Sequence, residues 1–136
     1  FHEIVAQCSY PYQQEEILSY ANSYGYALKD YDIKQILALN SNALYASWMN
    51  EKHVFEQSYI IKEKKQVVHG FMDLVIYKED EIIIIDFKTD ATDNENKLID
   101  MYAAQLQTYK HSMERITDLP IKTYIYAFSL FKCILL

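Results

Sequence analysis

Glycine and proline are scarce in this sequence, with two residues of each among 136. Such a chain has few hinge points, and it contains no repeat, low-complexity tract or Pro/Gly-rich linker. It also lacks an apolar run near the roughly 18 residues of a membrane-spanning helix, and it shows no signal peptide. The composition, 51% apolar and 24% charged residues, is that of a globular protein. We therefore expect one compact, cytoplasmic domain.

Cysteine is equally scarce. Cys8 and Cys133 lie near opposite ends of the chain and form no CxxC or Cys/His spacing. This excludes, within the chain, a structural zinc site built on cysteines and a four-cysteine iron–sulfur cluster. A disulfide and two free thiols remain alternatives, and the wide separation favours two buried thiols in a cytosolic protein.

An excess of basic charge is also missing. The net charge is -6, from 13 Lys+Arg against 19 Asp+Glu. A free-standing nucleic-acid binder usually carries a basic face, so charge alone argues against tight DNA binding by this chain. Bound metal ions, or further domains of a larger protein, would change that balance.

Hydrophobic periodicity divides the chain into a helical first third and a part that forms a sheet. Helical spacing runs through residues 12–25, 30–41 and 41–52, with Gly25 placed to end the first helix and Asp32 placed to cap the second. From residue 54 the period changes to two, which predicts antiparallel strands over 54–64, 66–78 and 82–88, the third buried on both faces. Residues 94–117 return to helical spacing, and residues 121–132 predict a last strand.

The segment "IIIIDFKTD", residues 82–90, carries four isoleucines directly into an aspartate and a lysine. Because side chains alternate along a strand, Asp86 and Lys88 share one face, roughly 6 to 7 Å apart, and Phe87 points into the core. A charged pair at the end of a buried strand either neutralises itself as a salt pair or holds a ligand.

A second carboxylate is expected beside the first. Asp73 follows Gly70 in a GxxD pattern, and the charged turn at residues 78–81 lets Asp73 come alongside Asp86. Two ionised carboxylates this close repel each other unless a divalent cation lies between them, and oxygen ligands favour Mg²⁺ or Mn²⁺ over zinc. Such an ion binds phosphodiester oxygens and acidifies water, and Lys88 would stabilise charge on the phosphate.

The helix that follows offers two further polar groups. Gln105 and Tyr109 are spaced i, i+4 and therefore share a face. An amide and a phenol together can donate hydrogen bonds to phosphate oxygens or stack on a base. GxxD, a turn, DxK and then QxxxY, in that order, indicate a site far more strongly than any one of them.

The stretch "GFMDLVIYKEDEIIIIDFKTD" followed by "YAAQLQTYKHSM" resembles the RecB-type nucleases of the PD-(D/E)xK superfamily. It is most similar to the C-terminal nuclease of AddA (RexA) helicase-nuclease subunits, over nearly the whole chain. The resemblance implies an α/β or α+β fold with a restriction-endonuclease-like core, a mixed central sheet flanked by helices. It also implies that residues 1–136 form a single nuclease domain excised from the C-terminal end of a larger helicase-nuclease.

The resemblance also assigns roles to residues. "FHEIVAQ" is similar to the family's helical histidine motif, and "DFKTD" is similar to its usual DYKTD, with Phe87 in place of tyrosine. It implies that the metal ligands are His2, Asp73, Asp86 and the backbone carbonyl of Phe87, that Lys88 is the catalytic lysine, and that Gln105 and Tyr109 assist substrate binding. Glu56, on the strand before GxxD, is a weaker candidate that would face the site.

The function implied is that of a Mg²⁺-dependent DNA exonuclease, with Mn²⁺ as a substitute, acting in double-strand-break repair and recombination. A covalently attached helicase region, missing from this chain, and a partner subunit of the AddB/RexB type would accompany it. The alternatives are a non-catalytic nucleic-acid-binding or scaffold domain of the same fold, and a purely structural DxK salt pair. For Lys62, Lys64 and Lys65, phosphate contact and a solvated turn remain alternative interpretations, and His69 has a structural or a phosphate-contacting role.

Overall fold

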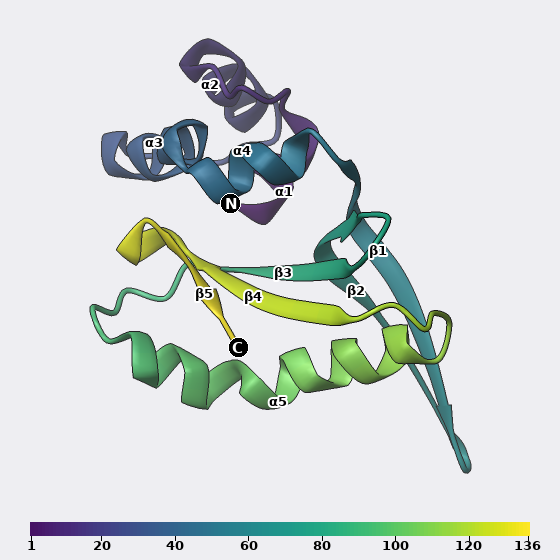
Figure 1. The fold of residues 1–136 in the computed structure, drawn as a ribbon. Helices are drawn as coiled ribbons and strands as arrows, with labels where there is room; N and C mark the ends of the chain where they lie inside the picture. The colour runs from purple at the N-terminus through teal and green to yellow at the C-terminus, as the bar shows by residue number, and fades with distance from the viewer.

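The computed structural model describes all 136 residues as a five-stranded sheet between two helical layers (Figure 1). Strand order follows the chain, and all neighbouring strands are antiparallel except β3 and β4, which are parallel. The predicted mixed sheet flanked by helices is confirmed. The helices are α1 (His2–Gln7), α2 (Gln14–Ser23), α3 (Asp30–Leu37), α4 (Ala43–Met49) and α5 (Glu95–Glu114), with 3₁₀ turns η1 (Ala38–Ser41) and η2 (Phe128–Leu130). The strands are β1 (Lys52–Glu63), β2 (Gln66–Tyr77), β3 (Ile82–Lys88), β4 (Ile121–Ala127) and β5 (Lys132–Leu135).

The ends of the N-terminal helices follow from local chemistry. Gly25 has a φ of 73° just after α2, and the next N–H, of Tyr26, donates to the carbonyl of Ala21 at 2.8 Å. This is the left-handed helix end for which glycine is suited. The prediction that Asp32 caps the second helix is wrong, because α3 begins at Asp30. Asp32 lies in the first turn instead, and its Oδ2 accepts a hydrogen bond from the N–H of Lys29 at 2.9 Å.

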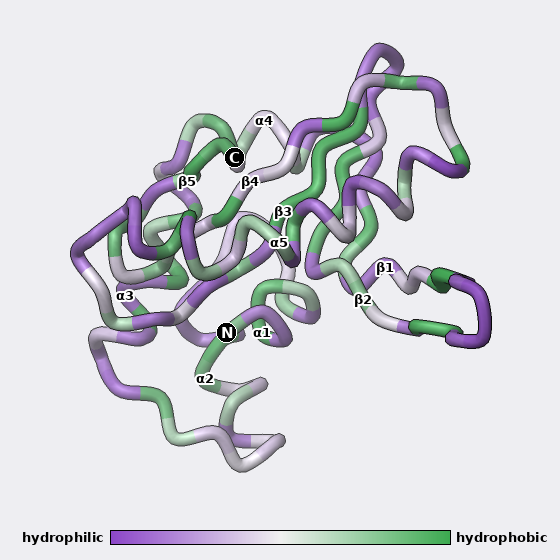
Figure 2. Tube along the Cα trace, turned by 90° about the horizontal axis from the view of Figure 1, so that it is seen from below, coloured by the Kyte–Doolittle hydropathy of each residue, from purple (hydrophilic) through white to green (hydrophobic).

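Strand β3 explains the run of isoleucines, because it is covered on both faces. Ile83 and Ile85 pack in the core under the N-terminal helices, and Ile82 and Ile84 pack in the core under α5. Figure 2 shows the isoleucine run of β3 as hydrophobic. The parallel pairing of β3 with β4 needs a long crossover, which α5 provides. No helix combines the length and the apolar character needed to cross a membrane.

The predicted strand over residues 121–132 is wrong in its second half. Strand β4 ends at Ala127, the chain turns through η2, and β5 returns antiparallel to β4. The reversal occurs at Phe131, which has a φ of 54°. Apolar residues continue through the turn without glycine or proline, so the sequence pattern does not reveal it.

Strands β1 and β2 form a long hairpin that extends beyond the sheet (Figure 1). The pairing of β1 with β2 is interrupted at Glu56 and Asp73. These two residues lie opposite each other and are not paired, although the residues on either side of them are. The hairpin is kinked at this position. Glu56 has a φ of 55°. Met72 packs under α5, whereas Leu74, two residues later, packs under the N-terminal helices. The kink therefore exchanges the faces of the hairpin at the position of Asp73.

Candidate functional site

The site begins where the pairing of β2 with β3 stops. The last pair in the register is Leu74 with Ile85, so Asp73 and Asp86 occupy the next opposed positions. Instead of a backbone bond there, Oδ2 of Asp73 accepts a hydrogen bond from the N–H of Phe87 at 2.9 Å. The Asp73 side chain thus takes the place of a backbone hydrogen bond between β2 and β3, at the point where their pairing ends. The structure thus brings the two aspartates together.

Asp86 is almost completely buried, with 3% of its surface exposed. Burial raises the pKa of its carboxyl from 3.8 to about 7, because the ionised form loses hydration, and the negative charge of Asp73 adds to this effect. The ammonium of Lys88 opposes the shift by favouring the ionised form. An acidic group whose pKa is moved so far, beside a named charge partner, is typical of functional sites.

The Asp86 carboxylate has an unsatisfied oxygen. The ammonium of Lys88 lies 2.7 Å from Oδ2 of Asp86 as an ion pair, but this oxygen is buried and has no partner in hydrogen-bond geometry. A buried charge without its full set of partners costs free energy. The ion pair with Lys88 therefore leaves Asp86 Oδ2 without a geometrically good hydrogen bond, and a carboxylate oxygen in this state is suited to bind a cation.

Lys88 connects the carboxylates to helix α5. Its Nζ donates to Oε1 of Gln105 at 3.0 Å, and Nε2 of Gln105 donates to the hydroxyl of Tyr109 at 3.0 Å. Burial, and the charges of Asp86 and Asp73, raise the pKa of Tyr109, so this phenol stays protonated. Because its oxygen accepts from Gln105, its own O–H is available to donate. The two polar helix positions found in the sequence thus join the site.

Tyr102 is a site residue that the sequence reasoning missed. Its ring lies under the Lys88 ammonium, 3.8 Å from Nζ to the ring centroid, which is a close cation–π contact. Its hydroxyl donates to both carboxylate oxygens of Asp90, at 3.1 and 2.8 Å. Spacing could have indicated it, because Tyr102, Gln105 and Tyr109 are at i, i+3 and i+7 on one helix.

Packing explains why residue 70, the first position of the GxxD pattern, is a glycine. A Cβ at this position would lie 2.6 Å from the hydroxyl oxygen of Tyr59 and 2.7 Å from its Cζ. The ring of Tyr59 crosses Gly70 and makes an edge contact with Tyr109, at 5.5 Å between ring centroids. The glycine therefore allows β1 to support the far end of the Lys88, Gln105 and Tyr109 chain of hydrogen bonds.

The donors at the site fit a hard divalent cation. They are the carboxylates of Asp73 and Asp86 and the carbonyl of Phe87, which points toward β2 because the N–H of the same residue does. No group of three or more His, Cys, Asp or Glu side chains is close enough to hold a metal ion by itself. Mg²⁺ does not need such a cage, because it usually binds one or two carboxylates and keeps several waters or phosphate oxygens.

Two candidates from the sequence are not part of this cluster. His2 is exposed, and it lines a hollow of about 300 Å³ with Tyr26 and Asp32, among others. The adjacent Phe1 amino group is near enough to Asp73 for that carboxylate to influence its pKa, which burial lowers. Glu56 is exposed at the kink, opposite Asp73. The roles of both residues as ligands stay predictions.

Comparison with known proteins agrees with this geometry. The sequence matches the PD-(D/E)XK nuclease superfamily over residues 12–129. The chain belongs to this superfamily. Asp86, Phe87 and Lys88 read D-X-K, the pattern in the superfamily's name, whereas Asp73 follows Met72 rather than a proline.

Three relatives of this PD-(D/E)XK chain are named as subunits of an ATP-dependent helicase/nuclease. The protein of Syntrophomonas wolfei is 29% identical over an alignment of 107 residues that covers 71% of this chain. That of Ligilactobacillus salivarius is 39% identical over 75 residues, or 54% of this chain, and that of Clostridium botulinum is 31% identical over 71 residues, or 52%. The aligned parts cover only 9%, 6% and 6% of those three proteins.

Proposed function

We propose that this chain is a metal-dependent nuclease domain that hydrolyses phosphodiester bonds in DNA. The observation that carries the proposal is the buried Asp86 carboxylate, whose Oδ2 lacks a hydrogen-bond partner beside Asp73 and Lys88. Membership of a nuclease superfamily and the D-X-K pattern at residues 86–88 support it. The metal proposed is Mg²⁺, with Mn²⁺ as a substitute, bound by Asp73, Asp86 and the carbonyl of Phe87.

The bound cation, Lys88 and Tyr109 would have different roles in catalysis. A bound divalent cation would supply the positive charge that polarises a phosphoryl oxygen and acidifies a water molecule. Lys88 has three N–H donors, of which one is used by Gln105 and one faces Asp86. The third points to the Tyr102 ring. The positive charge of the ammonium, held in place by these contacts, would stabilise the charge that builds on the phosphate, and the O–H of Tyr109 can donate to another phosphate oxygen.

The relatives suggest the setting in which this nuclease acts. Because they are called ATP-dependent helicase/nuclease subunits, we propose that the domain belongs to a larger polypeptide with a helicase region and acts as an exonuclease in double-strand-break repair and recombination. A partner subunit of the AddB/RexB type would complete the machine. In that setting the helicase delivers DNA, so an acidic nuclease domain need not hold duplex DNA on its own.

The direct test is cleavage of labelled DNA by the purified chain. We expect linear single-stranded or duplex DNA to be degraded in MgCl₂ and to stay intact when EDTA removes the metal. Circular single-stranded DNA of the same sequence should be resistant if the enzyme needs an end. Intact DNA under every metal condition, from a chain that is folded by circular dichroism, would favour the non-catalytic scaffold instead.

Tyr102 gives a second prediction. Replacement of Tyr102 by leucine removes the ring under the Lys88 ammonium, and we expect the cleavage rate to fall about ten-fold, since a desolvated cation–π contact is worth roughly 1 to 2 kcal/mol. Tyr102→Phe keeps the ring and loses only the hydrogen bonds to Asp90. It should retain most of the activity. If both variants lose the same amount of activity, the hydrogen bonds of the Tyr102 hydroxyl to Asp90 matter, and the ring under Lys88 does not.

A further inference from the structure

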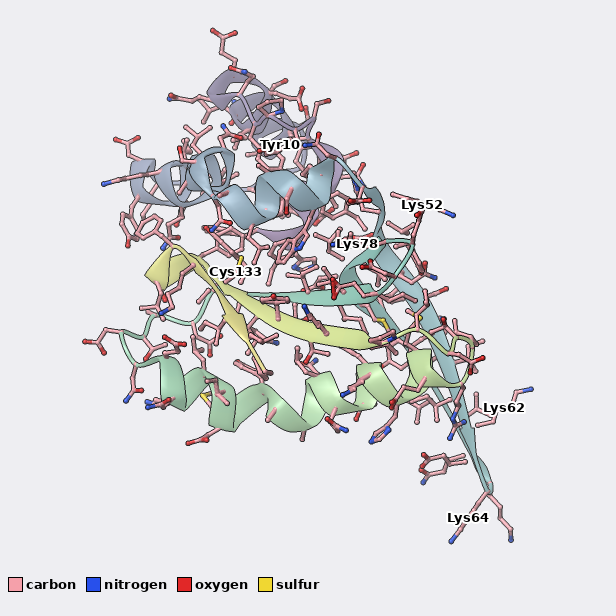
Figure 3. All side chains as sticks on the ribbon, viewed as in Figure 1. Tyr10, Lys52, Lys62, Lys64, Lys78 and Cys133 are labelled. Atoms are coloured by element: carbon pink, nitrogen blue, oxygen red, sulfur yellow. The ribbon has the colours of Figure 1, made fainter.

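The end of the β1–β2 hairpin is the one strongly basic feature of an acidic chain. Lys62, Lys64 and Lys65 lie within four residues, with one glutamate between them, although acidic residues outnumber basic ones 19 to 13 overall. Figure 3 shows Lys62 and Lys64 at the far end of the hairpin, with Lys64 at its tip directed away from the body of the protein. Charge that projects so far from the sheet does not serve the packing of the core.

The turn itself is unusual for a hairpin. Glu63 pairs with Gln66, so the two residues of the turn are Lys64 and Lys65, and Lys64 has a φ of 48°. Glycine, asparagine or aspartate normally occupies such a left-handed position, because other side chains are strained there. Placing lysine at this position gives up conformational stability for charge. Departures from local preference of this kind are expected at functional sites.

The hairpin also presents an open face behind its basic tip. Ile60, Val67 and Phe71 are 60%, 67% and 57% exposed, and the register places them on one face with Lys62 and His69. The rings of His69 and Phe71 are in edge contact, with centroids 5.3 Å apart. Figure 2 shows a hydrophilic tip with a hydrophobic stretch behind it on each arm. Aromatic and basic side chains on one surface suit bases and phosphates together.

A fourth cation lies at the base of the tip. Arg115, just after α5, has its Nη2 4.0 Å from Oε1 of Glu63, and both are exposed. Arg115 and the turn line an open hollow of about 720 Å³ whose other walls are polar, formed by Lys62, Glu63, Lys64, Lys65 and Gln66. Four cations therefore surround a single carboxylate, which leaves a positive surface for an anionic partner.

We propose that this hairpin binds the phosphate backbone of the DNA strand whose scissile bond lies at Asp73 and Asp86. The inference rests on the proposed function, since it assigns the hairpin to the same substrate. Asp73 is on β2 itself, and the eight residues from there to Lys65 span roughly 26 Å of strand, about the rise of eight base pairs. The hairpin thus adds affinity only for DNA that extends well beyond the cleaved bond.

The test compares two triple variants of equal charge. In one, Lys62, Lys64 and Lys65 are replaced by glutamine. In the control, three other exposed lysines are replaced likewise: Lys29 and Lys34, at the start of α3 and within it, and Lys52, at the opposite end of β1. Binding of a fluorescent single-stranded 20-mer is measured by anisotropy in EDTA between 20 and 200 mM NaCl. We expect the hairpin variant to bind at least ten-fold more weakly at low salt, with the slope of log K against log[NaCl] reduced by about two. The control should match the wild type.

The length of the probe separates this proposal from the proposed function. A 4-mer is too short to contact the tip and the Asp73 region at the same time, so the difference between the hairpin variant and the wild type should be smaller for it than for the 20-mer. Phe71→Ala should weaken binding of the 20-mer with an unchanged salt slope, because it removes stacking rather than charge. Equal affinity of both triple variants for the 20-mer would overturn the proposal, as would tighter binding of a polyglutamate peptide than of DNA. Because metal and cleavage are absent from this assay, it remains decisive even if the chain proves inactive as a nuclease.

Discussion

Lys88→Gln should lower the single-turnover rate of DNA cleavage by roughly 10² to 10³-fold at saturating Mg²⁺, the usual effect of removing a preorganised donor to developing charge. The Lys88 ammonium is fixed from three directions, by Asp86 at 2.7 Å, Gln105 at 3.0 Å and the Tyr102 ring at 3.8 Å. Such fixation means that no reorganisation is needed when charge appears on the phosphate. Glutamine occupies similar space without the charge, so the loss should appear in the rate and not in DNA affinity.

The comparison variants for this prediction are Lys88→Arg and Lys78→Gln. Arginine keeps the charge, but its planar fork cannot occupy the position of a compact ammonium between Asp86 and a ring, so partial activity is expected. Lys78 is bonded only to Glu81 in the turn before β3, and its replacement should leave cleavage unchanged. If Lys88→Gln cleaves DNA as fast as the wild type, the lysine is structural and its proposed role is wrong.

Most of the fold can be predicted from the sequence, because hydrophobic period and strand chemistry are local. The change of period near residue 54, the charged turn at residues 78–81 and the run Ile82 to Ile85 each correspond to the observed elements. The separation of β4 from β5 could not be predicted, because the turn at Phe131 uses none of the usual turn residues. Alternation along β3 also places Asp86 and Lys88 on one face, and their charged groups meet there, 2.7 Å apart.

The rest of the site depends on contacts between elements that are distant in sequence. The kink at Glu56 and Asp73 exchanges hairpin faces, and alternation along an ideal strand cannot anticipate it. The position of the Tyr102 ring under Lys88 depends on how α5 lies across β3. Likewise, the tight approach of Tyr59 to Gly70 appears only when β1 and β2 are paired. Local patterns identify which residues carry the chemistry, and tertiary packing determines which residues support them.

Asp86→Asn should stabilise the metal-free chain at pH 8 and remove its response to Mg²⁺. Burial, reinforced by Asp73, raises the pKa of Asp86 from 3.8 to about 7. The folded chain therefore holds this proton more tightly than the unfolded chain, and the resulting stability is lost as pH rises from about 4 through 7. Above pH 7 the ionised, buried Asp86 costs the wild type up to about 4 kcal/mol, and asparagine avoids this cost. The free energy of unfolding in urea, measured in EDTA at pH 5 and pH 8, should show the gain mainly at pH 8.

The effect of Mg²⁺ on the free energy of unfolding distinguishes a metal ligand from an ordinary buried acid. At pH 8, Mg²⁺ that binds only the folded wild type should raise its free energy of unfolding by RT ln(1 + [Mg²⁺]/Kd), whereas Asp86→Asn should show no rise. Asp100→Asn changes an exposed aspartate on α5 and should match the wild type in both buffers. If Asp86→Asn still gains stability from Mg²⁺, the cation binds elsewhere. A variant that is more stable without metal, yet unable to respond to it, would mean that the wild type maintains a destabilising carboxylate for cation binding, the trade-off expected of a functional residue.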